Sequence, residues 1–172
     1  MTNRTKDTYQ KHIYDFIKDI YVVCPACGGQ GIIRCPEFSF KDRDEHNIKL
    51  VCTKCGHNKR FDEKSNSILS ASSNKVITGK YFIIGGTVDP YFHLPLWLTI
   101  NCCDHILWAY NYEHLDFLRG HVEAKLRERN TQVMANKSLG SRLPKWMTSK
   151  KNRATVLKCI DDLKNNKLDN KM

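Results

Sequence analysis

The segments Cys24-Pro-Ala-Cys27-Gly28 and Cys52-Thr-Lys-Cys55-Gly56 decide the fold of this chain. In each, a tight turn can present two thiolates toward one point, as a tetrahedral zinc ion requires. The glycine after each pair suits such a knuckle turn. The 24 residues between the pairs are enough for two strands and a turn. The sequence therefore predicts one structural zinc ion held by Cys24, Cys27, Cys52 and Cys55.

The other four cysteines are not arranged in such pairs. Cys102 and Cys103 are adjacent and His105 follows closely, so these side chains form a second cluster with metal-ligand chemistry. A metal there would need a fourth ligand from elsewhere in the chain. Buried cysteines in an apolar hairpin are the commoner case, and the sequence leaves both interpretations open. Cys35 and Cys159 are predicted to be packing residues.

The composition is that of a folded protein. The chain has 172 residues, 41% hydrophobic and 27% charged, which is typical of one ordinary domain or two small ones. The longest runs without a charge, at 20–33 and 90–103, span 14 residues each, fewer than the ~20 that a membrane-spanning helix needs. Residues 1–20 lack the apolar core of a signal peptide. We therefore expect a soluble, cytoplasmic protein without a membrane partner.

The net charge of +10 is distributed unevenly. Residues 1–60 carry 11 basic and 7 acidic side chains, residues 61–120 carry 4 and 6, and residues 121–172 carry 13 and 5. Within 133–160 there are seven basic side chains and no acidic one. Such a segment attracts polyanions, which predicts contact with nucleic acid or with an acidic protein. The candidate nucleic-acid contacts are Arg142, Lys145, Trp146, Lys150, Lys151 and Arg153.

Hydrophobic periodicity predicts helices near both ends of the chain. Residues 6–20 carry apolar side chains at helical spacing and predict an amphipathic N-terminal helix. A second helix is predicted over 112–128, with Asn111 as its N-cap. The apolar face of this second helix consists of Leu115, Leu118, Val122 and Leu126. The basic tail is predicted to hold two more helices, near 139–147 and 150–163.

Short β-like runs between these helices complete an α+β fold. Strand signals at 76–84, 92–100 and 106–110 predict a small antiparallel sheet against which the 112–128 helix packs. Residues 64–75 are rich in serine and asparagine and are predicted to be a linker. The predicted parts are an N-terminal helix plus zinc ribbon (1–63), the linker (64–75), the sheet plus helix (76–129) and a basic helical tail (130–172).

One pattern in this region suggests an enzyme. Asp104, His105, Asn111 and His121 have the order of an HNH nuclease core. Only five residues separate His105 from Asn111, too few for the hairpin that a ββα-metal site requires. A core strand followed by an amphipathic helix explains the same residues, and a catalytic base needs geometry that this spacing does not provide. We therefore expect a protein without catalytic residues and keep a degenerate nuclease as the less favoured alternative.

The cysteine segments CPACGGQG (24–31) and CTKCGH (52–57) resemble the transcription factor IIB-like zinc ribbon superfamily. This resemblance covers about 40 residues and implies a zinc ribbon, which serves many functions. Further segments look like a group of small bacterial zinc-ribbon proteins without a characterised activity. They are PLWL (95–98), CCDHILWAYNYEHL (102–115), LRER (126–129), SRLPKWM (141–147) and KNRATVLK (151–158).

Together these patterns favour a non-catalytic zinc-ribbon protein that contacts nucleic acid, DNA or RNA, through the ribbon and the basic tail. The alternative is a zinc-stabilised adaptor subunit whose tail and apolar helix dock onto a larger protein partner. The sequence indicates no small-molecule substrate. It also leaves open which nucleic acid or protein is bound and in what oligomeric state.

Overall fold

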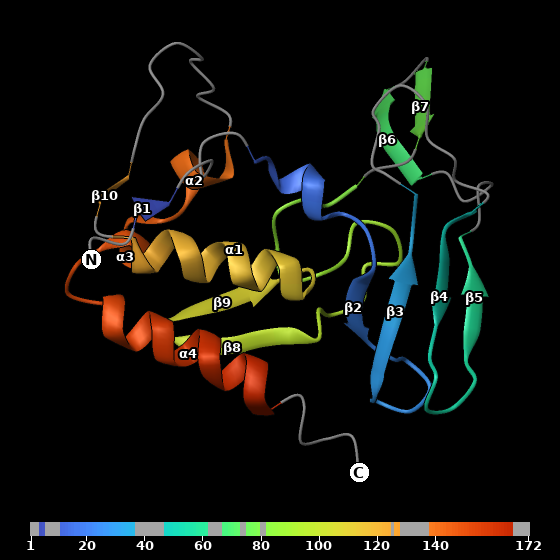
Figure 1. Cartoon of the computed structure of the whole chain (residues 1–172). Helices are drawn as coiled ribbons and strands as arrows, with labels where there is room; N and C mark the ends of the chain where they lie inside the picture. Colours follow the sequence, from blue (N-terminus) through green and yellow to red (C-terminus); the bar gives the residue numbers. More distant parts are fainter. Residues whose placement is uncertain are drawn as a thin grey trace. The chain divides into compact units, whose positions relative to one another are not determined.

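The structure is a computed structural model (Figure 1). Its described residues are 4–5, 11–36, 47–61, 67–72, 75–79, 82–124, 126–127 and 138–166. They form helices and antiparallel sheets, which confirms the predicted α+β class. Two compact units result: the ribbon unit, Lys18–Trp97, and the helical unit, Met1–Ile17 together with Leu98–Met172. No helix within the described ranges is long and apolar enough to cross a membrane.

The ribbon unit is built on a four-stranded antiparallel sheet in the order β2-β3-β4-β5. Successive side chains of a strand point to opposite faces, so the sheet has one buried face. β3 and β4 pair directly, as the spacing between the cysteine pairs predicts. The buried side chains Ile20, Val22, Ile33 and Leu50 are 0% exposed. The strands are β2 (Ile20–Val23), β3 (Gln30–Arg34), β4 (Lys49–Val51) and β5 (Asn58–Arg60).

A later segment of the chain covers the free edge of β2. The Val23 N–H donates to the Pro95 carbonyl and the Trp97 N–H donates to the Tyr21 carbonyl, each at 2.9 Å. Edge strands are commonly protected in this way from pairing with other chains. The predicted 92–100 strand is therefore divided between the units. Its residues 95–97 lie beside β2, whereas its last residues open the hairpin of the helical unit.

A buried carboxylate shapes the loop that leads into this edge. Asp89 is 0% exposed, and burial raises the pKa of its carboxyl group while backbone hydrogen bonds lower it in part. The carboxylate oxygens accept three backbone N–H groups at 2.6 to 2.8 Å, from Tyr91, Phe92 and Leu94. The side chain thereby closes the loop that places residues 95–97 beside β2.

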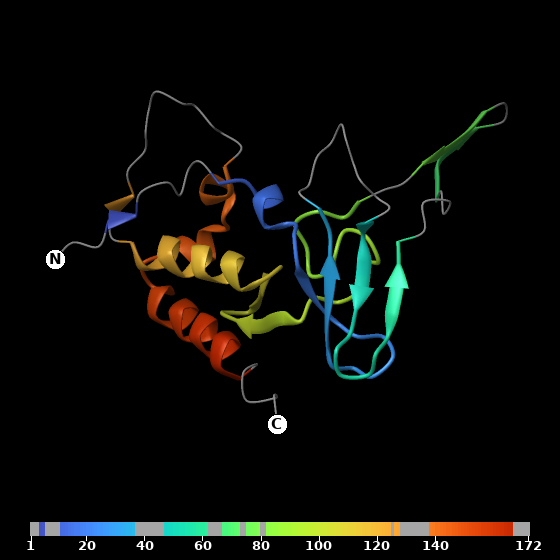
Figure 2. The same cartoon turned by 45° about the vertical axis from the view of Figure 1, so that its right-hand side comes forward.

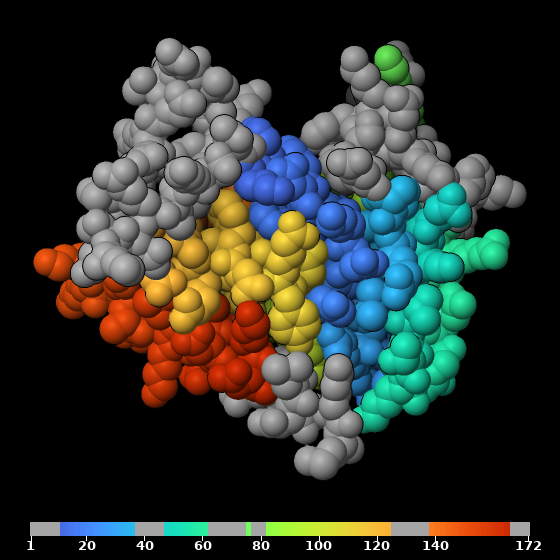
Figure 3. Space-filling model, in the orientation of Figure 1, coloured from blue at the N-terminus to red at the C-terminus, as the bar shows by residue number. Residues whose placement is uncertain are grey.

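The helical unit packs two α-helices on a β-hairpin (Figure 2). β8 (Leu98–Cys102) and β9 (His105–Ala109) form the hairpin, and α1 (Tyr112–Glu123) and α4 (Arg153–Asn166) are the helices. α1 contacts β9, α4 contacts β8, and the two helices contact each other, so that their surfaces lie side by side (Figure 3). The core of this unit includes the buried residues Leu98, Leu107, Leu115, Val156 and Ile160.

Helix α1 begins where the sequence predicts it. The Asn111 side chain accepts the His114 N–H at 2.8 Å, which is N-capping. The helix ends at Glu123 rather than at 128, because β10 (Leu126–Arg127) pairs in parallel with β1 (Arg4–Thr5) instead of continuing the helix. The predicted C-terminal boundary is therefore wrong, whereas the predicted apolar face is buried at Leu115, Leu118 and Val122.

The predicted N-terminal helix is wrong where the structure describes it. Residues 6–10 lie outside the described residues, η1 (Ile13–Phe16) is a single 3₁₀ turn, and β2 begins at Ile20. Asp19 has a φ of +48°, in the left-handed region, which an α-helix cannot continue through. The apolar residues of this stretch serve different units, since Phe16 is buried in the helical unit and Ile20 in the ribbon unit.

A β-hairpin occupies part of the predicted linker 64–75. β6 (Ser67–Ser72) and β7 (Lys75–Gly79) pair in antiparallel fashion. Composition favours a loop here because serine and asparagine are common in turns. The backbone pairing between the two strands overrides that weak preference.

Pro144 divides the first predicted tail helix into two single turns. They are α2 (Leu139–Arg142) and α3 (Lys145–Thr148). Proline lacks an N–H group and disfavours helical backbone at the residue before it, so a helix ends there. The second predicted tail helix is present as α4, which begins at Arg153, and its side chains Val156, Ile160 and Leu163 are buried.

The buried face of α1 yields a stability prediction. Leu118 is 2% exposed, so Leu118→Ala should lower the free energy of unfolding by about 2–5 kcal/mol through lost burial and a residual cavity. Chemical denaturation measures this. The control is Ile106→Ala, because Ile106 is 53% exposed and its truncation should change the stability by no more than about 0.5 kcal/mol. Equal costs for the two variants would mean that this face of α1 is not part of the core.

Candidate metal centre

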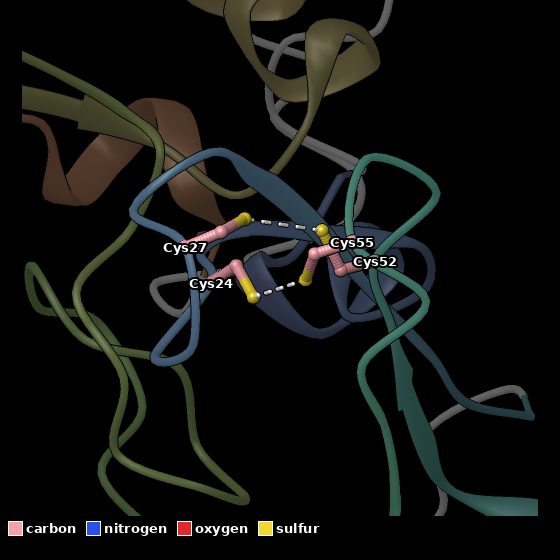
Figure 4. A group of neighbouring side chains, drawn as sticks. All are labelled: Cys24, Cys27, Cys52 and Cys55. Carbon is pink, nitrogen blue, oxygen red and sulfur yellow. Dashed lines mark hydrogen bonds between the residues drawn. The ribbon is translucent and has the colours of Figure 1, made fainter.

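The four cysteines of the two pairs point toward a common centre (Figure 4). Their sulfur atoms all lie within 4.8 Å of one another. The Cys24 and Cys55 sulfurs are 3.7 Å apart, and so are those of Cys27 and Cys52. Four sulfurs at roughly 2.3 Å from a tetrahedral ion are separated by about 3.8 Å. Both 3.7 Å separations match this value, so the arrangement could hold a metal ion of the size of zinc.

Each pair lies in a turn that is closed by the same two backbone hydrogen bonds. In the first turn, the Cys24 N–H donates to the Gly29 carbonyl at 2.7 Å, and the Gly28 N–H donates to the Cys24 carbonyl at 2.9 Å. In the second turn the corresponding distances are 2.8 and 3.0 Å, for Cys52 to His57 and Gly56 to Cys52. The site is therefore made of two equivalent knuckles, each at the end of one hairpin of the sheet.

Glycine is required in both knuckles because of the backbone conformation. Gly28 has a φ of +68° and Gly56 a φ of +74°, in the region that L side chains rarely adopt. No heavy atom lies within 4 Å of the place that a Cβ atom would occupy at either residue. The constraint is therefore conformational rather than steric, and it confirms the predicted role of these glycines.

The thiols of the cluster influence one another's ionisation. Burial raises the pKa of Cys52, but the backbone N–H groups of Cys55 and Lys54 and the neighbouring thiols outweigh it and lower the pKa to about 7. The backbone of His57 lowers the pKa of Cys55, but the thiol of Cys27 and its neighbours raise it to about 12. Crowded thiols cannot all carry a charge unless a cation neutralises them. The cluster is thus suited to bind a positive ion.

The ligand set also indicates what the ion would do. Cys24 and Cys52 are buried, whereas Cys27 and Cys55 are exposed. Four cysteines complete a tetrahedron and leave no open coordination position for a substrate or water. The ion would therefore be structural, and it would tie two hairpins together in a unit too small to rely on its apolar core alone.

The second cysteine cluster does not form as the sequence suggested. Within the described ranges, the only group with metal-binding geometry is that of the two knuckles. The His105 ring stacks on Trp146 instead, with ring centroids 4.8 Å apart and planes at 17°. The neighbour that the sequence missed is Cys159: burial raises the pKa of the Cys102 thiol, and the nearby Cys159 thiol raises it further. The position of Cys159 in α4, far along the chain, gave no local signal of this proximity.

Two residues of the HNH-like pattern have structural roles in the helical unit. Besides capping α1, Asn111 donates from its side-chain amide to the Phe16 carbonyl at 3.1 Å. His121 is 1% exposed within the same helix. The neighbouring His114 is also buried, which lowers its pKa to about 3, and its Nδ1 accepts the Tyr110 N–H at 3.3 Å. Asn111 and His114 thus hold the start of α1 in place, whereas His121 is buried near its end.

The candidate nucleic-acid contacts all belong to the helical unit. Trp146 and Arg153 are half-buried, and the other four are exposed: Arg142, Lys145, Lys150 and Lys151. They lie in α2, in α3, before α4 and at its first residue. The structure therefore places the predicted cations at the surface, on a short stretch of chain.

Comparison of the chain with protein-family models, curated proteins and solved structures found no match. The resemblance to the transcription factor IIB-like zinc ribbons stays a prediction. The metal centre stands on its own geometry, namely the sulfur separations and the paired knuckles.

The geometry predicts one zinc ion per chain. Elemental analysis of the purified protein should find about one equivalent of zinc, and the protein should be colourless, whereas iron in a four-sulfur site absorbs visible light. Cys24→Ser with Cys52→Ser should abolish binding and unfold the ribbon unit, since metal binding supplies folding free energy there. Cys35→Ala is the control and should retain the ion. A metal-free protein, or an unchanged fold in the double variant, would contradict the site.

Zinc affinity should fall steeply with decreasing pH. The pKa of Cys55 is about 12 and that of Cys52 about 7 in the metal-free cluster, and each thiol must lose its proton to bind. Protons therefore compete increasingly as pH falls below 7. From these two thiols we expect the logarithm of the apparent binding constant to drop by about two per pH unit below pH 7, measured by competition with a chromophoric chelator. A flat profile would mean that thiolates are not the ligands.

Proposed function

We propose that this chain is a non-catalytic zinc-ribbon protein that contacts nucleic acid through its basic tail and its ribbon. The observation that carries the proposal is a group of five exposed or half-buried cations within residues 142–153, which we call the tail surface. None of the five forms an ion pair with another described residue. They are Arg142, Lys145, Lys150, Lys151 and Arg153.

Other cations of the helical unit form ion pairs, unlike the five cations of the tail surface. Arg119 pairs with Asp161 at 3.1 Å, and Lys164 pairs with Asp116 at 2.7 Å. These ion pairs involve the later turns of α4. The cations at the beginning of α4 have no such acidic partner among the described residues. A concentration of uncompensated positive charge at one place attracts phosphates and releases their counterions on binding.

An aromatic ring lies within this charged surface. Trp146 follows Lys145 in α3, is half-buried, and stacks on the exposed His105 ring. Its carbonyl accepts a hydrogen bond from the Asn152 side chain at 3.0 Å, which links α3 to the start of α4. Proteins that bind single-stranded nucleic acid combine a positive surface with rings on which bases stack. The combination supports nucleic acid as the polyanion.

The ribbon carries exposed cations of its own. Lys49 and Arg60 lie directly opposite each other on β4 and β5, and Lys59 is next along the same edge strand. All three are exposed. Like charges opposite each other destabilise a pair of strands, and a bound phosphate would relieve the repulsion. This supports a contribution of the ribbon to binding.

The alternative, an adaptor that docks onto a larger protein, is supported by the same tail surface, because an acidic protein would also be attracted to it. The apolar face of α1 does not support it, since Leu115, Leu118 and Val122 are buried within the unit. The leading proposal therefore remains nucleic acid. Salt dependence separates the two, because each phosphate contact contributes its own released counterion.

Charge reversal in the tail surface should weaken binding to DNA or RNA irrespective of sequence. With Lys150→Glu and Lys151→Glu, the slope of log binding constant against log salt should become shallower by about two. Fluorescence anisotropy over a range of salt concentrations measures this. The matched control is Lys11→Glu with Lys158→Glu, which changes the net charge equally at two exposed lysines outside the tail surface and should leave most of the slope intact. Lys49→Glu with Arg60→Glu tests the ribbon in the same way.

Two outcomes would overturn the proposal. One is equally poor binding of DNA and RNA by the wild type and the tail variant at roughly 50–100 mM salt, where ~5 phosphate contacts should be visible. The other is an equal loss of slope in the tail variant and its matched control, which would reflect net charge alone. Thermal unfolding of each variant checks that it is folded.

A further inference from the structure

Three cysteine thiols that the metal centre does not use lie together in the helical unit. Cys102 ends β8, Cys103 begins the turn that follows, and Cys159 lies in α4. Burial raises the pKa of the Cys102 thiol, and the nearby thiols of both others raise it further. The Cys102 thiol also lies 3.9 Å from the Thr155 carbonyl oxygen, to which it can donate. This thiol cluster therefore bridges the hairpin and the helix.

The packing of α4 on β8 explains why Cys159 reaches Cys102. Thr155 and Cys159 are one helical turn apart on the same face of α4, and a helical side chain leans back over the preceding turn. The Cys159 side chain thus lies above the Thr155 carbonyl, which the Cys102 thiol contacts. The packing of α4 on β8 therefore brings two thiols from elements far apart in sequence close together.

The hairpin turn sets the direction of the other two thiols. Cys102 pairs with His105, so Cys103 and Asp104 form a two-residue loop. Their φ angles are +52° and +60°, which is the type I′ geometry that matches the twist of a hairpin. Because Cys103 belongs to the same hairpin as Cys102, the two sulfurs that can link separate elements are those of Cys102 and Cys159.

The cluster suits a bond between two sulfurs better than a metal ion. Within the described part of the chain, these thiols do not form a group of three ligands close enough for one ion. A disulfide needs only one close pair and a small approach of the sulfurs to about 2.05 Å. Cys102 is 3% exposed, whereas Cys159 and Cys103 are half-buried. An oxidant from solution therefore reaches Cys159 before Cys102.

We propose that Cys102 and Cys159 form a reversible disulfide that ties α4 to β8 in the presence of a hydroperoxide. The Cys159 thiolate attacks the peroxide, so that an S–O bond forms, the O–O bond breaks, and one water leaves once protonated. The Cys102 sulfur then attacks the sulfenic acid, an S–S bond forms, the S–O bond breaks, and a second water leaves. Overall, two thiols and hydrogen peroxide give one disulfide and two waters. A dithiol reverses the bond by thiol–disulfide exchange.

The roles of the two thiols follow from their surroundings. Burial raises the pKa of Cys102, and the neighbouring thiols raise it further, so its reactive thiolate is rarely formed. It is therefore the second sulfur to react, on a sulfenic acid that is already close to it. The bond would hold α4 on the hairpin through a covalent link, independently of what the tail surface binds.

Peptide mapping tests this disulfide directly. The zinc-loaded full chain is treated with graded hydrogen peroxide, alkylated with N-ethylmaleimide, and digested with trypsin without reduction. The expected product is a linked pair of the peptides 81–119, which holds Cys102 and Cys103, and 159–164, which holds Cys159. It should be absent before oxidation, and dithiothreitol should remove it. Oxidation should also raise the thermal unfolding midpoint, because a cross-link restricts the unfolded chain.

Variants assign the linked pair. Cys159→Ala should abolish the linked peptides and the rise in the unfolding midpoint, whereas Cys103→Ser should retain both. Cys35→Ala is the matched control, a half-buried thiol of the ribbon unit, and should behave as the wild type. The proposal is overturned if peroxide gives only alkylated or over-oxidised Cys159 without a cross-link. It is also overturned if Cys103→Ser removes the linked pair, since Cys103 would then be the partner.

Discussion

The two knuckles meet because β3 and β4 are neighbours in an antiparallel register that sets Ile33 opposite Leu50. The first knuckle precedes β3 and the second follows β4, so this register brings both to the same end of the sheet. A shift of one residue would turn the buried side chains outward and would separate the sulfur pairs. The same strand register therefore fixes both the metal site and the buried face of the ribbon, and each stabilises the register that the other needs.

The helical unit depends on different forces. Its hairpin and helices bury aliphatic side chains, and Asn111 links the start of α1 to η1 by capping α1 and donating to the Phe16 carbonyl. Asp116 and Asp161 form ion pairs between α1 and α4. What remains is a helix that is neutralised over its later turns and positive at its beginning. The separation of charge along α4 is thus a consequence of how the two helices pack.

Local patterns predict much of this protein because the interactions concerned are local. A Cys-x-x-Cys-Gly segment contains the ligands and the left-handed residue of a knuckle, so the metal ligands and the roles of Gly28 and Gly56 can be predicted. The N-cap at Asn111 and the buried face of α1 follow in the same way from spacing within one helix. The prediction of a helix over 6–20 is wrong because the apolar residues of this segment belong to two units. Periodicity within one segment does not show that its residues pack in different units.

The amino-acid sequence alone determined the metal-binding chemistry, the α+β class and the place of the basic segment, since each rests on residue types and short spacings. Only the tertiary structure decided which distant segments pair: residues 95–97 with the edge of β2, Phe16 with the helical unit, and Cys159 with Cys102. These contacts join residues far apart in the chain. They arise from the burial of apolar faces and the satisfaction of backbone hydrogen bonds across the whole unit, and no short stretch of sequence encodes them by itself.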